Sequence, residues 1–280
     1  MSELRAGYPG MTRKITVCFK AVPEFEQVVD ADWDHFSCNA DWGYVKRVFG
    51  CFDESALETA LRLRSAWEAA GVKAECTALT AGPLPPSLCT ALFAAGFDQV
   101  LELSGDSGAG GLEFRPRYTA ALLGGCLRAG GFDLILAGRQ TGYADTGTVP
   151  LLLAEALGVP VVTGVEELAP CAGGVEALRS DNGGRERLRV RLPVVAVLGN
   201  SPVSALRAAT LRDRMAASKR SAEGLILPVP GEDDGERRAA GTLRVSREKR
   251  RGVCRFLPGG GGLAQSVAGI REDYLGRREP

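Results

Sequence analysis

Short apolar runs alternate with segments of helical periodicity through much of the chain. The apolar runs predict strands, and the periodic segments predict helices. Strands that alternate with helices are typical of a parallel sheet whose faces are covered by the helices, so the pattern predicts an α/β fold. The predicted strands are 14–20, 74–80, 99–103, 134–137 and 159–163, and the predicted helices include 52–70, 86–95 and 117–128. The segment 145–157 predicts a polar N-cap followed by a helix with Pro150 in its first turn.

The pattern changes after the strand predicted at 159–163. Two short runs, 175–179 and 187–191, flank the turn Asp181-Asn182-Gly183-Gly184, and this arrangement predicts a β-hairpin. The second arm of the hairpin leads into a further predicted strand at 194–198. The hairpin is therefore expected as an addition to the parallel sheet.

The last part of the chain is less regular. Residues 228–241 are charged and contain Gly and Pro, and residues 259–262 are four glycines, so neither segment suits a packed core. We expect a compact domain at 13–220, followed at 221–280 by a linker and an extended C-terminal arm. Because the arm has little apolar surface of its own, we expect a partner chain to support it.

Composition excludes several classes of protein. The 280 residues contain 34 Lys and Arg against 34 Asp and Glu, and a net charge of zero argues against nucleic-acid binding, which needs concentrated basic charge. The sequence contains no run of 18 apolar residues, and its first residues lack an apolar signal segment. We therefore expect a cytoplasmic protein without membrane insertion.

The residue types that usually perform catalysis form no recognisable constellation. The eight cysteines contain no CxxC and are expected to be buried free thiols without a metal, and the single histidine, His35, is expected at the surface. Asp53, Glu54 and Glu58 begin a predicted helix, where complementarity to the helix dipole explains them. The sequence has no GxGxxG after the first predicted strand and no GxxxxGK[ST] or GxSxG motif, so an ordinary dinucleotide dehydrogenase, a P-loop protein and a serine hydrolase are not indicated.

In open parallel sheets, ligands bind at the carboxyl ends of the strands. The loops that follow strands at 20–25, 81–83 and 137–149 are therefore the candidate sites. The third loop precedes a predicted helix and combines Gly147 with the hydroxyls of Thr146 and Thr148, which suits a phosphate or pyrophosphate. A simple Gly- and Thr-rich turn is the alternative.

Taken together, these segments resemble the beta subunit of the electron transfer flavoproteins, the FixA-like family. The similarity covers residues 13 to about 220 and rests on five ordered motifs. They are Val17-Cys18-Phe19-Lys20-Ala21-Val22-Pro23, Phe52-Asp53-Glu54-Ser55-Ala56-Leu57-Glu58-Thr59-Ala60-Leu61-Arg62-Leu63, Gly82-Pro83, the run ALFAAGFD at 91–98, and Ala137-Gly138-Arg139-Gln140 with its continuation through Asp145-Thr146-Gly147-Thr148-Val149 to Pro160.

The resemblance implies a Rossmann-like, mostly parallel sheet and a heterodimer with an alpha subunit whose FAD lies near the interface. It also implies an adenine nucleotide, AMP or a second FAD, within this chain. Phe25 and Phe52 match aromatic residues near the flavin or the interface. The cofactor-binding residues implied are Cys18, Lys20, Ala21, Val22, Phe25, Gly50, Phe52, Ala81, Gly82, Gln140, Thr141, Gly142, Asp145, Thr146, Gly147, Thr148 and Val149.

The choice between the two nucleotides depends on the loop at 143–149. Asp145-Thr146-Gly147-Thr148-Val149 is similar to the run found in electron-bifurcating relatives, which favours FAD. Tyr143-Ala144 replaces the family's Asp-Gly, and a ring near the phosphates would narrow the path that a flavin needs. Two further departures are Gly50-Cys51 in place of Asn-Pro, which removes an amide that contacts the nucleotide, and Pro150 in place of Gly.

The implied function is an electron carrier between a flavin-dependent dehydrogenase and another acceptor, with or without electron bifurcation. The family's partner-recognition segment is similar to the stretch from Asn200 to Lys219, into which about four residues are inserted. Leu206, Leu211 and Met215 are its candidate apolar anchors, beside basic residues. A nucleotide-binding sensor of the universal-stress type, whose fold shares the same sheet, is the alternative function.

Overall fold

The computed structural model describes residues 12–29, 32–34, 39–40, 43–105, 112, 114–228 and 262–271. The chain divides into two compact units, Met1–Arg244 and Val245–Pro280. The first unit contains the sheet and the helices that cover it. The second contains helix α8 (Gly262–Ile270).

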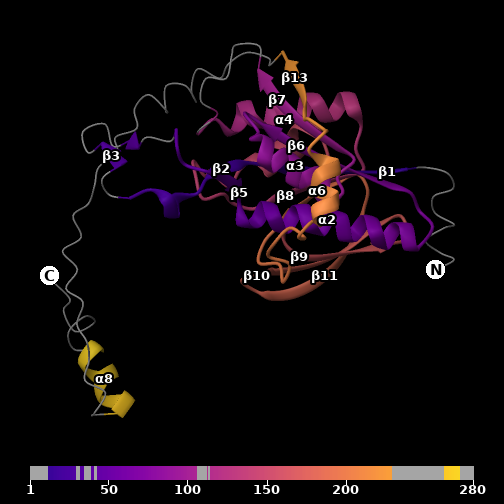
Figure 1. The fold of residues 1–280 in the computed structure, drawn as a ribbon. Helices are drawn as coiled ribbons and strands as arrows, with labels where there is room; N and C mark the ends of the chain where they lie inside the picture. Colours follow the sequence, from indigo (N-terminus) through magenta and orange to yellow (C-terminus); the bar gives the residue numbers. More distant parts are fainter. Residues whose placement is uncertain are drawn as a thin grey trace. The chain divides into compact units, whose positions relative to one another are not determined.

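Among the described residues, nine strands of the first unit form one sheet in the order β11-β10-β9-β12-β8-β1-β6-β7-β13 (Figure 1). All neighbours are parallel except at the β9–β10 and β10–β11 pairs, which are antiparallel. The strands are β1 (Arg13–Phe19), β6 (Ala74–Ala81), β7 (Gln99–Gly105), β8 (Leu134–Gly138), β9 (Val161–Cys171), β10 (Gly174–Asp181), β11 (Gly184–Arg191), β12 (Val194–Leu198) and β13 (Glu223–Leu227).

Helices cover both faces of this sheet, because successive side chains along a strand point to opposite faces and apolar side chains lie on both. In β1, Ile15 and Val17 belong to the core beneath one set of helices, whereas Cys18 belongs to the core beneath the other set. The first set is α2 (Cys51–Ala69), α3 (Pro86–Ala95) and α6 (Leu211–Ala217), and the second is α4 (Pro116–Gly130) and α5 (Val149–Leu157). The sheet is therefore the middle of three layers.

Helix α2 is the longest helix of the described residues and lies across one face of the sheet (Figure 1). Its apolar positions recur at helical spacing, and Leu57, Leu61 and Trp67 are buried. The helix ends before Gly71, whose φ of +80° is a conformation that favours glycine. Two further pairs of short strands belong to this unit. Strand β5 (Arg47–Phe49), which ends just before α2, pairs with β2 (Ala21–Pro23), and β3 (Trp33–Asp34) pairs with β4 (Asn39–Ala40).

The structure confirms the predicted α/β fold with its mostly parallel sheet and added hairpin. The helix predicted at 86–95 and the strand predicted at 194–198 have the expected bounds. The strand predicted at 159–163 is instead the long strand β9, which pairs with the hairpin β10–β11. The last helix before it begins at Val149, so Asp145 to Thr148 lie in the loop, where Gly147 has a φ of +62°.

The sheet extends beyond residue 220, the boundary predicted for the compact domain. Strand β13 pairs in parallel with β7, and Leu225 and Leu227 pack against the core beneath α4. A five-residue segment with three apolar residues gives little periodicity from which to place it in a sheet. Several residues lie outside the described part of the chain: His35, Cys38, Cys254, most of the linker at 228–241, and the arm that follows except for 262–271.

The cysteines of the described part are free, as expected. Cys18, Cys76, Cys89 and Cys126 are buried, whereas Cys51 is exposed and Cys171 is partly exposed. The described residues contain no cluster of His, Cys, Asp or Glu able to hold a metal ion. In this part of the chain, no helix has the length and apolar character needed to cross a membrane.

Candidate functional site

The order of the strands changes direction beside β1, and a cleft opens there. From β1 the chain continues to β6 and β7 on one side, and it then returns to β8 on the other side. At such a point the loops that follow adjacent strands diverge, which leaves space at the carboxyl ends of the strands. The cleft has a cavity volume of about 130 Å³ and is open to solvent. It is lined by the ends of β1 and β6, by residues before and in the first turns of α4, and by the loop from β8 to α5.

The loop between β8 and α5 provides one wall of the cleft. The Asp145 carboxylate accepts a hydrogen bond of 2.9 Å from the backbone N–H of Gly147, which supports the left-handed turn at that glycine. The hydroxyls of Thr146 and Thr148 lie 3.2 Å apart. The Thr148 side chain makes no capping hydrogen bond at the N-terminus of α5, so this end of the helix presents positive potential to the cleft. Pro150 has no N–H, and the N–H of Leu151 donates to the Thr148 carbonyl oxygen, so the N–H of Val149 is the helix-end donor of this turn. Such an end suits an anion.

Asp53 forms the floor of the cleft from the first turn of α2. Its side chain is buried, with 3% of the residue exposed, and accepts a 3.2 Å hydrogen bond from the backbone N–H of Lys20. The backbone N–H of Gly138 also donates to it, so one carboxylate joins the ends of the adjacent strands β1 and β8. Burial raises the pKa of Asp53 to about 7, although these hydrogen bonds and the charge of Lys20 oppose the shift.

This environment corrects the interpretation of Asp53 as a residue that only complements the helix dipole. The residue lies in the first turn of α2, as expected, but its carboxylate points inward to two strand ends. A sequence window around Asp53 contains neither partner, because Lys20 and Gly138 are distant along the chain. Glu54, from the same turn, is half-buried, and burial raises its pKa.

Three basic side chains line the cleft: Lys20, Arg115 and Arg139. The ammonium of Lys20 donates a 2.8 Å hydrogen bond to the carbonyl oxygen of Tyr143, and the Arg139 guanidinium lies 4.8 Å from the centre of the Phe52 ring. The acidic side chains of the lining are Asp53 and Asp145. Among the described residues of the lining, three basic side chains thus accompany two carboxylates, and the raised pKa of Asp53 leaves this group partly neutral near pH 7. This described part of the lining carries net positive charge, which favours an anionic ligand.

Sequence reasoning missed Arg115 and its neighbours. Arg115 lies at the N-terminus of α4, beside Phe114, whose φ of +58° is uncommon for a residue with a side chain. The guanidinium of Arg115 lies 4.2 Å from the centre of the Tyr118 ring. The segment before α4 follows β7, and no motif marked it. Only the placement of β7 beside β6 brings this segment to the cleft.

More than half of the predicted cofactor residues line the cleft, and the others lie next to it. Cys18 is in the lining, but burial raises the pKa of its thiol far above the usual range, so it remains protonated. Gly50 is the N-cap of α2, and Ala21 and Val22 are buried in β2. The predicted residues in the lining are Cys18, Lys20, Ala81, Gln140, Thr141, Asp145, Thr146, Gly147, Thr148 and Val149; those outside it are Ala21, Val22, Phe25, Gly50, Phe52, Gly82 and Gly142.

The predicted partner-recognition residues differ in their surroundings. Leu211 and Met215 lie one turn apart on α6 and are 75% and 64% exposed. Leu206 instead packs against the core beneath α2, so it is not an exposed anchor. Helix α6 begins with a capping box in which Thr210 and Asp213 bond reciprocally.

These observations define a doubly wound α/β protein with a cleft, lined in its described part by three basic side chains, at the point where the strand order changes direction. Residues 44–226 match the family described as the electron transfer flavoprotein domain, and the chain belongs to this family. Within the family it is similar to the beta subunits. This result confirms the resemblance found in the sequence motifs.

The similarity to individual relatives extends over most of the chain. YgcR of Escherichia coli (strain K12), which carries the name of an electron transfer flavoprotein subunit, is 29% identical over 271 residues, or 94% of this chain and 98% of the relative. The electron transfer flavoprotein subunit beta of Mycobacterium tuberculosis (strain ATCC 25618 / H37Rv) is 27% identical, over 84% of this chain and 88% of the relative. The subunit beta of Megasphaera elsdenii is 26% identical, over 80% and 82%.

Proposed function

We propose that this chain binds an adenine nucleotide in the cleft and pairs with an alpha subunit that holds FAD. The heterodimer then carries electrons from a flavin-dependent dehydrogenase to another acceptor. The observation that carries the proposal is the convergence of the N-terminus of α5 with Lys20, Arg115 and Arg139 on one cleft. Basic side chains, a helix N-terminus and hydroxyls together are features that hold a nucleotide phosphate.

Each part of the cleft has a distinct task in this proposal. The hydroxyls of Thr146 and Thr148 and the N–H of Val149 at the start of α5 would hold the phosphates, and Lys20 and Arg139 would balance their charge. Asp53 would hold the two strand ends together and so keep the cleft in shape. A bound FAD supplies the capacity to accept and release electrons singly or in pairs.

The position of Tyr143 supports FAD over AMP in the cleft. The sequence suggested that this ring would narrow the path of a flavin. Instead the ring of Tyr143 packs beside Phe25, with 5.8 Å between ring centres, and lies outside the lining of the cleft. Together with the run from Asp145 to Val149, this arrangement favours a second FAD in the proposal.

Expression together with an alpha subunit tests the proposed function. We expect a yellow heterodimer from which acid releases two FAD molecules. One FAD with one AMP would preserve the carrier function but overturn the choice of nucleotide. A colourless homodimer that retains ATP would instead support the universal-stress alternative.

Substitutions in the loop before α5 test whether it holds the phosphates. We expect Gly147→Val to lower nucleotide occupancy strongly, because a β-branched residue is strained at a φ of +62°. A clash is not the cause, since an added Cβ would meet only the Arg139 carbonyl oxygen, at 3.8 Å. Thr146→Ala should weaken nucleotide binding about tenfold through loss of one hydrogen bond to a charged group. Titration of nucleotide into the stripped heterodimer measures both effects.

Thr163→Ala is the matched control for the loop, because Thr163 is an exposed residue of β9 outside the cleft lining. Full nucleotide affinity in both Gly147→Val and Thr146→Ala would show that this loop is not the phosphate site.

We propose that the C-terminal segment contacts the alpha subunit. Helix α8 exposes Val267 and Ile270, which lie one turn apart on one face, and such a face suits a partner chain. A chain that ends at Pro228 keeps β13 in the sheet and removes this segment. We expect it to bind the alpha subunit at least about tenfold more weakly by calorimetry. A chain that lacks only 272–280 is the control, and equal affinity of the two shortened chains would contradict this contact.

A further inference from the structure

Helix α6 presents apolar side chains to solvent although it is too short to be stable by itself. It spans seven residues, and Leu211 and Met215 point away from the core. Isolated helices of this length do not persist in water, so other contacts must fix α6 in place. Those contacts determine how Leu211 and Met215 are presented.

The C-terminal end of α6 is held by packing and by Arg220. Ala217 is buried in the core beneath α2 and α3. A guanidinium nitrogen of Arg220 donates a 2.6 Å hydrogen bond to the carbonyl oxygen of Asp98, and the group lies 3.8 Å from the centre of the Phe93 ring. This end of the helix is therefore anchored to α3 and the turn that follows it.

The chain that enters α6 is held by Glu58 of α2. The backbone N–H and the Nε of Arg207 both donate to one carboxylate oxygen, at 3.1 and 3.0 Å, and Nη2 donates to the other oxygen at 3.1 Å. Three hydrogen bonds between one carboxylate and one residue fix both the backbone and the side chain of Arg207. Thr210, the N-cap of α6, follows only three positions later.

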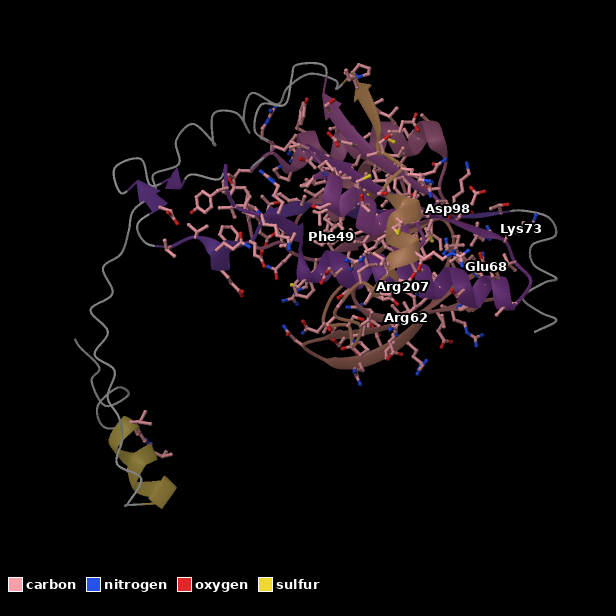
Figure 2. The ribbon with its side chains drawn as sticks, in the orientation of Figure 1. Phe49, Arg62, Glu68, Lys73, Asp98 and Arg207 are labelled. Carbon is pink, nitrogen blue, oxygen red and sulfur yellow. The ribbon has the colours of Figure 1, made fainter. Side chains whose placement is uncertain are left out.

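Glu58 remains ionised in this position. Its side chain is only 5% exposed, and burial opposes the charge, but the hydrogen bonds from Arg207 and Arg62 outweigh burial and lower the pKa. Arg62 bonds to the carboxylate from the exposed side, at 2.9 Å, one turn along α2. Figure 2 shows Arg62 and Arg207 close together along this helix. Arg62 therefore shares the carboxylate without contacting the segment before α6.

The surface around α6 indicates the chemistry of a partner. Leu211 and Met215 are flanked by the exposed side chains of Arg212, Arg214 and Lys219. Apolar anchors within a basic rim fit an apolar pocket with an acidic rim on the partner.

We propose that Glu58 is a positioning residue, which fixes α6 through Arg207 so that Leu211 and Met215 meet the redox partner in a preformed arrangement. This inference rests on the proposed electron-carrier function. A preformed helix lowers the entropy cost of each encounter, because the segment is already ordered before the partner binds. Without the Glu58–Arg207 contact, the folded domain and its cleft would persist, but α6 would fray.

Limited digestion with trypsin tests this positioning in the intact heterodimer without any partner. Trypsin cuts after Arg212 and Arg214 only when α6 opens, so the rate of these two cuts reports the order of the helix. In Arg207→Ala and Glu58→Gln, we expect cleavage at both sites to accelerate about tenfold, the effect of losing about 1.4 kcal/mol of local stability. Arg62→Ala is the matched control and should leave the rate within about twofold.

If Glu58→Gln does not fold, Arg207→Ala decides the result, because it leaves Glu58 paired with Arg62. Unchanged cleavage after Arg212 and Arg214 in Arg207→Ala would overturn the proposal. Nucleotide content should equal that of the wild type in every variant. A wild-type heterodimer without nucleotide would count against the proposed function and not against the positioning of α6.

Electron exchange supplies a readout that looser packing alone would not change. A flavin-dependent dehydrogenase that reduces the wild-type heterodimer serves as the donor. We expect Arg207→Ala and Leu211→Ala each to raise the donor concentration at half-maximal rate about tenfold and to leave the maximal rate unchanged. Arg207→Lys, which keeps the charge but not the planar fork, should restore part of the loss. Faster trypsin cleavage with an unchanged half-maximal concentration would overturn the positioning role.

Discussion

Gly138→Ala is expected to destabilise the domain and to abolish the nucleotide binding that we propose for the cleft. A Cβ at this position would lie 2.6 Å from the Asp53 carboxylate, 2.9 Å from the backbone nitrogen of Asp53 and 2.9 Å from the carbonyl carbon of Phe52. Two of these atoms are backbone atoms in the first turn of α2, so no side-chain rotation can relieve the contact. Relief would require α2 to move away from β8, which opens the floor of the cleft.

We expect Gly138→Ala to lower the free energy of unfolding by about 3 kcal/mol, as overpacking in a core does. Denaturant unfolding measures this change, and extraction of the heterodimer measures its nucleotide. Gly130→Ala is the matched control, because an added Cβ there has nothing within 4 Å and lies at the end of α4. If Gly138→Ala matched the control in stability and nucleotide content, the close approach of β8 to α2 would not shape the cleft.

The burial of Asp53 is expected to make stability depend on pH. Its pKa is about 7 in the folded chain and near the ordinary value of 3.8 in the unfolded chain, so between these values the folded state holds a proton that the unfolded state has released. The free energy of unfolding therefore falls as the pH rises from about 4 to about 7 and is level above that range. The contribution of this one group is on the order of 4 kcal/mol.

Asp53→Asn isolates this contribution, because an amide cannot titrate. We expect the variant to gain stability relative to the wild type as the pH rises from about 4 to about 7, whatever their difference at low pH. Denaturant unfolding at a series of pH values measures the two curves. Asp181→Asn, in the exposed hairpin turn, is the control and should run parallel to the wild type. A constant difference between Asp53→Asn and wild type would contradict the raised pKa.

The two buried carboxylates of α2, Asp53 and Glu58, have different roles because they lie at different positions along the helix. Asp53 accepts hydrogen bonds from backbone groups, and burial raises its pKa, whereas Glu58 accepts hydrogen bonds from two arginines, which lower its pKa. The first joins the ends of β1 and β8 at the cleft, and the second holds the segment that leads to α6. Both residues lie in the acidic start of a helix, and their sequence context alone did not separate them.

Local pattern predicted much of the scaffold. The helix at 86–95 ends at Gly96, which adopts a positive φ, and the strand at 194–198 is a continuous apolar run buried on both faces. Such elements can be predicted locally, because the hydrophobic period, the turn residues and the burial all indicate the same element within a short stretch of sequence. Strand β13 lacks such signals, since its pairing with β7 depends on a distant strand.

The candidate site was also predictable only in part, because some of its residues are brought together by strands that are distant in the sequence. The glycine and threonines of the loop from Thr146 to Thr148 indicated an anion site, and the structure places this loop in the cleft lining. Arg115 belongs to no motif and reaches the cleft only because β7 lies beside β6. The orientation of Tyr143 toward Phe25 likewise depends on two loops that the strand order brings together.

The sequence by itself determined the alternation of strands and helices, the hairpin and the loop that faces the cleft, because each depends on residues close together in the chain. Only the tertiary structure decided that Asp53 lies beneath the cleft, that Leu206 is packed and that Glu58 holds Arg207. These outcomes depend on burial and on partners far apart in the sequence. Burial makes the charged form of a side chain less favourable, and hydrogen bonds from distant residues offset this effect. Both the burial and the hydrogen bonds arise only when the chain folds.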